Sequence, residues 1–162
     1  MRQTVGVTPA IVLLEKLGID FTIHRYDHDP AAESFGMEAA EVLGLDPGVV
    51  FKTLMARLDG PGGELVVAIV PVDEMLDLKK LAKAAGTKKA AMADVSDAER
   101  ATGYVAGGIS PLGQRQRHRA FVDETAEICD EVYVSGGQRG VDVSMAPGDL
   151  IAAADASYAP LT

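Results

Sequence analysis

The chain has 162 residues, and its 48% hydrophobic and 24% charged residues are typical of an ordinary folded domain with one core. A formal net charge of −9 and an aromatic content of 5% disfavour DNA binding, which needs a broad positive surface, and base stacking on aromatic rings. No apolar run is long enough for a membrane helix, so no membrane partner is expected. The only cysteine, Cys129, gives no disulfide framework and no thiolate metal site, and with no visible signal peptide the expected location is cytoplasmic.

Up to residue 86, the patterns predict three helices, one separate strand and one hairpin. Thr8, Ser34 and Asp77 are N-cap residues, each followed by apolar residues at helical spacing. The tract 59–63, Asp-Gly-Pro-Gly-Gly, is typical of a hairpin turn, and the strand after it is apolar on both faces, which predicts a central position. After a loose tail over 1–7, we expect helices over 9–17, 34–43 and 77–85, strands over 21–27, 49–57 and 64–71, and a single helical turn after Asp46.

The second half of the chain also mixes short strands with helices. We expect strands over 88–93, 118–123, 131–135 and 141–145, helices over 96–102 and from Pro147, and a turn over 136–140. Because two of the strand pairs are hairpins, the predicted fold class is α+β, a single domain over 1–162 with a mixed, largely antiparallel sheet surrounded by helices. No Walker loop or dinucleotide fingerprint occurs, so no nucleotide cofactor is expected.

The stretch 103–113, Gly-Tyr-Val-Ala-Gly-Gly-Ile-Ser-Pro-Leu-Gly, is the first candidate for a functional site. Its glycines and proline exclude a helix interior or a central strand, yet its apolar residues are unusual for a solvated loop. Such a loop packs down and brings bare backbone N–H groups close to a ligand oxygen, either a carbonyl or a phosphate. The alternative is a tight structural turn between two elements.

Two charged residues in strands are further candidates. Lys52 is the only charge between Val49 and Ala56, and a lysine among apolar neighbours needs a partner or an anionic ligand, unless it faces solvent on an edge strand. Asp142 follows a glycine turn, where it either satisfies backbone donors or pairs with Lys52 if the two strands are neighbours.

Conventional catalytic and metal motifs are not found in the sequence. The three histidines have no metal-ligand spacing, and neither Ser110 nor Ser135 lies in a nucleophile elbow. Cys129 has no positioned base and is interpreted as a buried structural thiol. Any catalysis is therefore expected to depend on backbone donors, Lys52 and positioning, with no metal and no cofactor.

Four segments in this order give the chain a family resemblance. They are Thr8-Pro9-Ala10, Val50-Phe-Lys-Thr-Leu54, the loop 103–113, and Ser135-Gly-Gly-x-Arg-Gly-x-Asp142. Together they resemble the YbaK/EbsC family, free-standing relatives of the editing domain of bacterial prolyl-tRNA synthetases, and the likeness runs from Thr8 onward. The resemblance implies a cytosolic aminoacyl-tRNA deacylase with a compact, partly barrel-like mixed sheet and no metal.

The resemblance also assigns roles to residues. Lys52 matches an essential lysine thought to position the 3′-terminal adenosine and the ester. The loop from Gly107 to Pro111 matches a segment whose backbone amides hold the aminoacyl carbonyl, which makes Gly107 catalytic. The catalytic set implied is Lys52, Gly107, Ser135 and Asp142, and the substrate-binding set is Tyr26, Phe35, Gly108, Ile109, Ser110, Pro111 and Gly136.

The function that the resemblance implies is removal of a wrong amino acid from tRNA. In the branch that acts on Cys-tRNA(Pro), the substrate's own thiol is thought to attack the ester, which fits the absence of a protein nucleophile. The alternatives are an Ala-tRNA(Pro) deacylase, in which an ordered water attacks, and a non-catalytic module that binds an aminoacyl or nucleotide ligand or a synthetase. The expected partner is the acceptor end of mischarged tRNA, and the acidic chain is expected to need a synthetase for most of the tRNA grip. Candidate tRNA contacts are Lys79, Lys80, Lys83, Arg115, Arg117 and Arg119, although a solvated helix face is the default interpretation of the three lysines.

Overall fold

A computed structural model describes residues 7–31 and 34–162, so most of the expected N-terminal tail lies outside the described residues. Five α-helices, two short 3-10 helices and eight strands follow one another in this part of the chain. In chain order they are α1 (Pro9–Lys16), β1 (Thr22–Arg25), α2 (Phe35–Leu43), η1 (Pro47–Val49), β2 (Phe51–Leu58), β3 (Leu65–Pro71), α3 (Leu78–Ala85), β4 (Ala90–Met92), α4 (Val95–Thr102), β5 (Arg119–Asp123), η2 (Glu124–Ile128), β6 (Val132–Gln138), β7 (Val141–Met145), α5 (Pro147–Ala154) and β8 (Ala156–Ala159).

The helix starts follow the local capping signals. The side chains of Thr8, Ser34 and Asp77 accept hydrogen bonds from backbone N–H groups in the first turns of α1, α2 and α3. Gly44 and Gly86 end α2 and α3 in the left-handed conformation. The three predicted N-caps are therefore confirmed.

The strands form two sheets with the orders β1-β7-β6 and β4-β2-β3-β5-β8. The pairs involving β1, β6 and β7 and those between β2, β3 and β4 are antiparallel, whereas β5 is parallel to β3 and to β8. A single parallel bridge between Val50 and Tyr133 joins the sheets. The predicted α+β domain with a mixed, largely antiparallel sheet is confirmed; the partly barrel-like closure is not.

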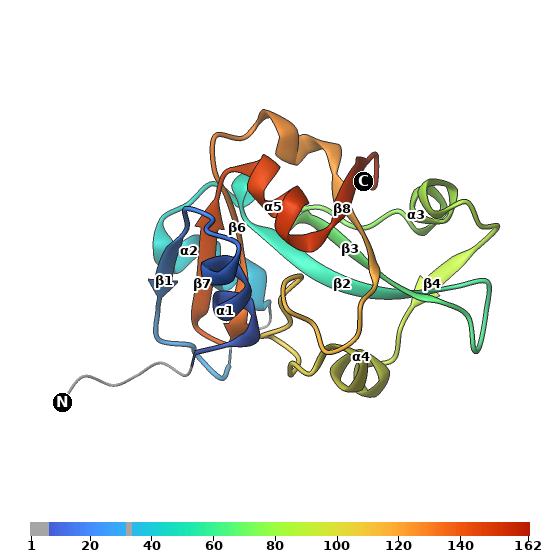
Figure 1. Ribbon diagram of the computed structural model, residues 1–162, viewed down its shortest axis with the longest axis horizontal. Coiled ribbons are helices and arrows are strands. Elements are labelled where there is room, and N and C mark those ends of the chain that lie inside the picture. The colour runs from blue at the N-terminus through green and yellow to red at the C-terminus, as the bar shows by residue number, and fades with distance from the viewer. Residues whose placement is uncertain (1–6, 32–33) are drawn as a thin grey trace.

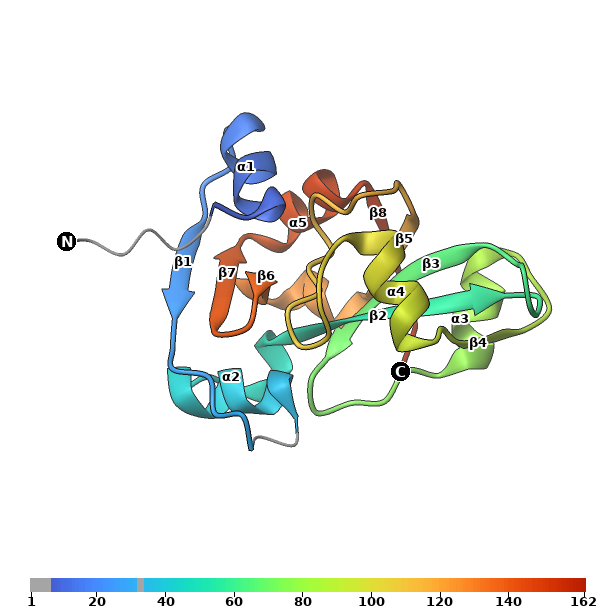
Figure 2. The same ribbon diagram turned by 90° about the horizontal axis from the view of Figure 1, so that it is seen from below.

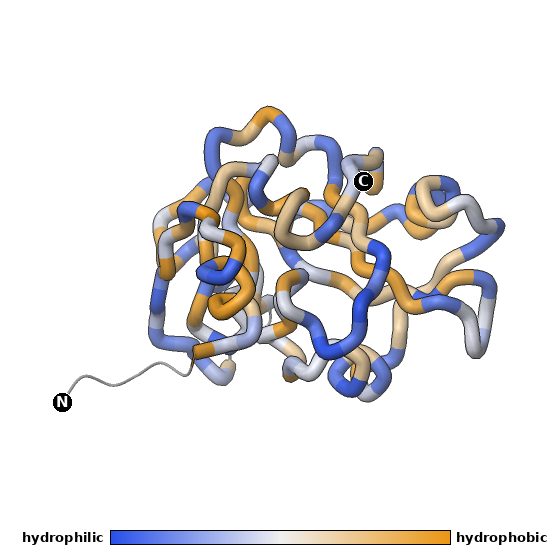
Figure 3. Tube along the Cα trace, in the orientation of Figure 1, coloured by the Kyte–Doolittle hydropathy of each residue, from blue (hydrophilic) through white to orange (hydrophobic). Residues whose placement is uncertain are grey.

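The main core lies between the sheets and α1, and hydrophobic stretches follow the central strands in Figure 3. A second apolar cluster lies under α3, on the other face of β2 and β3. Figure 1 places α1, α2 and the three-stranded sheet at one end of the molecule, and α3 and β4 at the other. As predicted, β3 is central and its residues Val66–Val70 are fully buried. Within the described residues, no helix is long and apolar enough to cross a membrane.

Several predicted bounds differ from the structure by a few residues. The helix expected from Ser96 begins one residue earlier, at Val95, with Asp94 at the N-cap. The turn expected over 136–140 is shorter, because β6 continues to Gln138 through an irregularity that shifts its register with β7. Strand β8 was not expected.

Candidate active site

A cavity of about 410 Å³ lies where the two sheets meet and is bounded by α2, β2, α4 and the glycine loop. In Figure 2, β2 runs from beside α2 past α4, so one strand forms the floor between the two helices. The cavity wall includes seven predicted site residues, which come from six separate segments of the chain: Tyr26, Phe35, Lys52, Gly107, Ile109, Ser135 and Asp142. The predicted catalytic set is therefore brought together in one place, although its residues are up to 90 positions apart in sequence.

Strand alternation explains why polar side chains face this cavity. In β7, Val143 and Met145 point into the main core, and Asp142, which directly precedes Val143, points the other way. Asp142 lies opposite Ser135 of β6 and His24 of β1, so the three residues share one face of the small sheet. His24 is held by a 2.7 Å hydrogen bond between its Nε2 and Ser144 Oγ, and it is not part of the cavity wall.

Asp142 is the buried carboxyl group of the site. Only 6% of its surface is exposed, and no ion pair with Lys52 is found among the described residues. Burial raises the pKa of Asp142 to about 7. Burial also raises the pKa of Tyr26 to about 12, with smaller contributions from the negative charges of Asp142 and Glu38. Asp142 can therefore exchange a proton near neutral pH, and Tyr26 stays protonated.

Lys52 lies on a part of β2 that has a partner strand on one side only, and the other side faces the cavity. Among the described residues, β2 pairs with β3 over nearly all its length but with β4 only from Ala56 onward. Val50, just before β2, forms an isolated bridge to Tyr133 of β6. The edge around Thr53 therefore opens into the cavity. Thr53 Oγ1 is buried and has no hydrogen-bond partner among the described residues. Lys52 and Asp142 lie on strands that are not neighbours, since β6 intervenes.

The glycine loop presents few free backbone donors to the cavity. The N–H of Ala106 donates to Glu99 Oε2 at 2.8 Å, that of Gly108 donates to Val105 O at 2.9 Å, and that of Leu112 donates to Ser110 Oγ at 3.2 Å. Pro111 has no N–H. Among the described residues, no partner is found for the amides of Gly107 and Ile109, and both residues line the cavity. The amides of Gly107 and Ile109 are therefore the loop donors that can form a hydrogen bond with a substrate oxygen in the cavity.

Four of the predicted binding residues lie behind the wall and do not line the cavity: Gly108, Ser110, Pro111 and Gly136. Ser110 is fully buried and its hydroxyl serves the loop backbone. The carbonyl of Gly136 accepts a 2.5 Å hydrogen bond from Thr8 Oγ1, which connects β6 to the start of α1. These four residues therefore pack behind the residues that line the cavity. Their direct contact with substrate stays a prediction.

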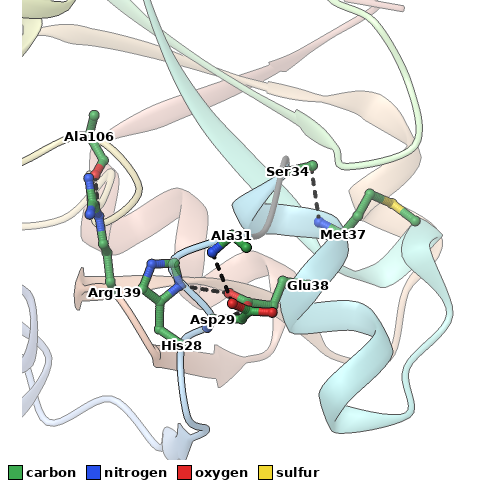
Figure 4. Close-up of polar contacts among 8 residues, drawn as sticks. All are labelled: His28, Asp29, Ala31, Ser34, Met37, Glu38, Ala106 and Arg139. Carbon is green, nitrogen blue, oxygen red and sulfur yellow. Dashed lines mark hydrogen bonds and ion pairs between the residues drawn. The ribbon is translucent and has the colours of Figure 1, made fainter.

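Figure 4 shows the polar contacts at the start of α2 and at the glycine loop. His28 Nδ1 lies 2.8 Å from Glu38 Oε1, and the hydrogen bond from His28 lowers the pKa of Glu38. Arg139 Nε donates to the carbonyl oxygen of Ala106 at 2.7 Å. The Arg139 guanidinium also lies 5.0 Å from the centre of the Phe35 ring. Arg139 thus links Phe35, the first residue of α2, to the glycine loop.

Several wall residues were not predicted from the sequence. They include the apolar residues Leu54, Met55, Met92, Ala93, Val95 and Ala98. Met92 and Val95 are exposed, and clustered apolar residues on a surface point to a function, but this exposure is visible only in the fold. Arg139 was present in the Gly-Gly-x-Arg-Gly motif, but no role was assigned to it.

Cys129 is half-buried, which corrects the prediction of a buried thiol, and burial raises its pKa. It does not line the cavity. In residues 7–31 and 34–162, no group of three or more His, Cys, Asp or Glu side chains is arranged to hold a metal ion.

Comparison with known proteins identifies the family of this site. The model of the aminoacyl-tRNA editing domain matches residues 29–153. The chain is 39% identical to EbsC of Enterococcus faecalis, a candidate Cys-tRNA(Pro)/Cys-tRNA(Cys) deacylase, over 99% of this chain and 96% of that protein. It is 27% identical to ProXp-y of Escherichia coli, a multifunctional Ser/Thr-tRNA deacylase, over 87% of this chain and 83% of that protein. A solved structure of a candidate trans-editing enzyme for prolyl-tRNA synthetase matches 99% of both chains with a TM-score of 0.82 and 24% identity, which shows the shared fold.

The fold and these matches define an enzyme of the aminoacyl-tRNA deacylase class. The chain belongs to the aminoacyl-tRNA editing family, as its motifs predicted.

Proposed function

We propose that the protein is a trans-acting deacylase that removes cysteine from Cys-tRNA(Pro) without an enzyme nucleophile. The observation that carries this proposal is the convergence on one cavity of Lys52, Asp142 and the free amide of Gly107. Neither serine of the cavity wall, Ser34 or Ser135, has a histidine partner among the described residues. The Ser144–His24 pair lies outside the cavity, and Ser144 is fully buried.

Each group has a distinct part in the proposed reaction. The amides of Gly107 and Ile109 donate to the ester carbonyl oxygen and stabilise the negative charge that develops on it. The Lys52 ammonium attracts the phosphate and ribose of the terminal adenosine. Asp142, with a pKa of about 7, accepts the proton that the attacking group loses.

For a cysteinyl ester, the attacking group is the thiol of the substrate itself. A sulfur–carbon bond forms as the carbon–oxygen bond to the ribose breaks. The thiol proton passes through Asp142 to the departing ribose oxygen. The products are tRNA with a free terminal hydroxyl and a cyclic thioester of cysteine, which water then opens. For an alanyl ester, a water molecule takes the place of the thiol.

The proposal also names the amino acid that is removed. The two relatives differ in the substrates that their names give, cysteinyl-tRNA in one and seryl- or threonyl-tRNA in the other. Small side chains are hard to separate by size alone, because one methylene group contributes only about 1–3 kcal/mol of discrimination. Cys-tRNA(Pro) is preferred because EbsC has the higher identity of the two and matches almost the full chain.

The test is deacylation of Cys-tRNA(Pro) and Ala-tRNA(Pro) by the wild type, Lys52→Ala and Lys89→Ala. Lys89 is an exposed lysine outside the cavity, so its variant removes the same charge without touching the site. Release of cysteine that is lost only in Lys52→Ala supports the proposal. Release of alanine alone changes the substrate to Ala-tRNA(Pro). Failure of the wild type to release either amino acid, even with prolyl-tRNA synthetase added, overturns catalysis and favours a binding module.

We propose that a synthetase provides part of the affinity for tRNA, since the chain carries a net charge of −9. Two of the candidate tRNA contacts form ion pairs within the protein, Arg117 with Asp155 and Arg119 with Glu64. Lys80 and Arg115 donate hydrogen bonds to backbone carbonyl oxygens. Addition of the synthetase should therefore lower the KM for tRNA more than it raises kcat. A cytoplasmic location, where charged tRNA is used, is part of this proposal.

A further inference from the structure

We propose that Arg139 is a positioning residue that orients and polarises the peptide group whose N–H acts on the substrate. The inference rests on the proposed function, because it concerns the amide of Gly107 as the donor to the ester carbonyl. It assigns to Arg139 a part in the reaction without any contact with the substrate.

The argument starts from a single peptide group. The carbonyl of Ala106 and the N–H of Gly107 belong to the same planar unit, and in a trans peptide they point in opposite directions. Arg139 Nε donates a 2.7 Å hydrogen bond to that carbonyl oxygen. Arg139 is exposed and is not part of the cavity wall, whereas Gly107 is. The bond to Arg139 therefore turns the Gly107 N–H away from solvent and toward the cavity side of the loop.

The same bond strengthens the donor. A positive charge on the oxygen side of a peptide draws electron density away from the nitrogen, and hydrogen bonds in a chain polarise one another in this way. An N–H polarised in advance binds a developing oxyanion more tightly than it binds a neutral ester carbonyl. The expected consequence is a gain in the chemical step, with little gain in substrate binding.

Neighbouring contacts hold this arrangement in place. Glu99 Oε2 accepts from the N–H of Ala106 at 2.8 Å, so Ala106 is fixed at both its N–H and its carbonyl. Gly107 has φ of +86°, a conformation that side chains disfavour. A Cβ at this position would lie 2.8 Å from Arg139 Nε and 3.0 Å from the Phe35 ring. Arg139, Phe35 and Gly107 are therefore packed as one unit.

The test compares Arg139→Ala, Arg139→Lys and Arg25→Ala in single-turnover deacylation of Cys-tRNA(Pro). Arg25 is an exposed arginine on the neighbouring strand β1, so Arg25→Ala removes the same charge without touching the loop. Removing a complete oxyanion donor costs about 10²–10³-fold, and we expect loss of polarisation and orientation to lower the maximal rate about 10-fold in Arg139→Ala. The apparent KM should change less than about twofold, and Arg139→Lys should recover part of the rate because its ammonium group is also a charged donor. The thermal transition of each variant serves as the control for folding.

A second readout needs no activity. In protein labelled with ¹⁵N-glycine, the amide signal of Gly107 should shift in Arg139→Ala and stay in place in Arg25→Ala. An unchanged signal overturns the inference, and so does a rate loss no larger than that of Arg25→Ala. A loss confined to KM makes Arg139 a tRNA contact and also overturns it. If the wild type is inactive, the proposed function fails, and the Gly107 signal still decides whether Arg139 controls the peptide.

Discussion

Two of the glycine-rich tracts of the protein contain a Gly-Gly pair and a proline but lie in different surroundings. The tract 59–63 closes the β2–β3 hairpin, and the tract 103–113 lines the cavity. Both contain glycines in the left-handed conformation, among them Gly62 at +80° and Gly107 at +86°. A Cβ added at Gly62 would meet nothing within 4 Å, whereas a Cβ at Gly107 would meet Arg139 and Phe35. Glycine content thus identifies a tight turn in both places, and only the surroundings distinguish a site from a connection.

The two tracts are also held by different bonds. At the hairpin, the exposed Asp59 side chain accepts from the amides of Lys88 and Lys89 at 3.2 and 3.4 Å. In the loop, the buried Tyr104 hydroxyl donates to the carbonyl of Leu112 at 2.6 Å. A buried hydrogen bond of this kind holds the backbone in one conformation, because breaking it would leave a buried polar group without a partner. The difference predicts that equal substitutions will have unequal effects in the two regions.

The largest expected effect comes from Gly107→Ala. The added methyl group must move Arg139 or Phe35, and the strained backbone would turn the Gly107 amide away from the cavity. Loss of an oxyanion donor costs up to about 10³-fold in kcat, or about 4 kcal/mol, and we expect a fall of this size in the single-turnover rate on Cys-tRNA(Pro).

Gly62→Ala is the matched control for that prediction. It imposes a similar positive-φ strain at an open position, so its activity should stay within about twofold of the wild type while its stability falls by about 1 kcal/mol. Equal rate losses in the two variants would show that the loop amide has no special part in the reaction.

The second effect is a pH-dependent gain in stability in Asp142→Asn. The native pKa of Asp142 is raised to about 7 from an ordinary value of 3.8, so between these values the native protein binds more protons than the unfolded chain. Wild-type stability should therefore fall as pH rises from about 4 to about 7, and the penalty is complete above that range. Asparagine removes the charge, which gives an expected gain of about 3 kcal/mol at pH 8, somewhat less than the full shift because the carboxylate adjoins the open cavity.

Denaturant unfolding at pH 5 and pH 8 measures this gain. Asp59→Asn at the hairpin is the control, because its exposed carboxylate carries no comparable burial. A stability difference between Asp142→Asn and the wild type that is the same at both pH values would contradict the raised pKa. Deacylation by Asp142→Asn should meanwhile lose the rise with pH near 7 that proton acceptance by Asp142 predicts.

These regions also show what sequence can predict. The caps Thr8, Ser34 and Asp77 were identified because their signals lie within one helical turn. Strand β8 was missed because it pairs in parallel with β5, more than 30 residues away, and nothing in its own four residues indicates that partner.

The site was predictable only as separate pieces. Lys52 and the loop were recognised by residue type, and the position of Asp142 near them depends on the bridge that joins the two sheets. The contact of Arg139 with Ala106 arises across 33 positions, and no local pattern carries it. Sequence therefore identified the chemical groups, and the arrangement that gives them a shared function required the fold.

A third and smaller effect tests the buried hydrogen bond between Tyr104 and Leu112 in the loop. Tyr104→Phe removes the hydroxyl that donates to Leu112 and leaves that carbonyl without its buried partner. The expected cost is about 1–2 kcal/mol in the free energy of unfolding. Asp59→Asn keeps the acceptor oxygen and tolerates the left-handed conformation at the hairpin, so it should cost less than about 0.5 kcal/mol. Losses of equal size would show that the two tracts are held equally firmly.

The smallest effect is expected from the lysines of α3, which lies at the same end of the molecule as β4. Lys79, Lys80 and Lys83 lie on the exposed side of α3, at the opposite end of the molecule from α2 in Figure 1. Reversing all three charges to glutamate should raise the KM for tRNA about threefold and leave kcat unchanged, because distant phosphate contacts help capture and do not touch the ester. Single-turnover assays at two salt concentrations measure the change, which should shrink as salt rises. An unchanged KM at low salt would show that α3 does not contact tRNA. A loss in kcat would show that the lysines of α3 affect the chemical step in the cavity.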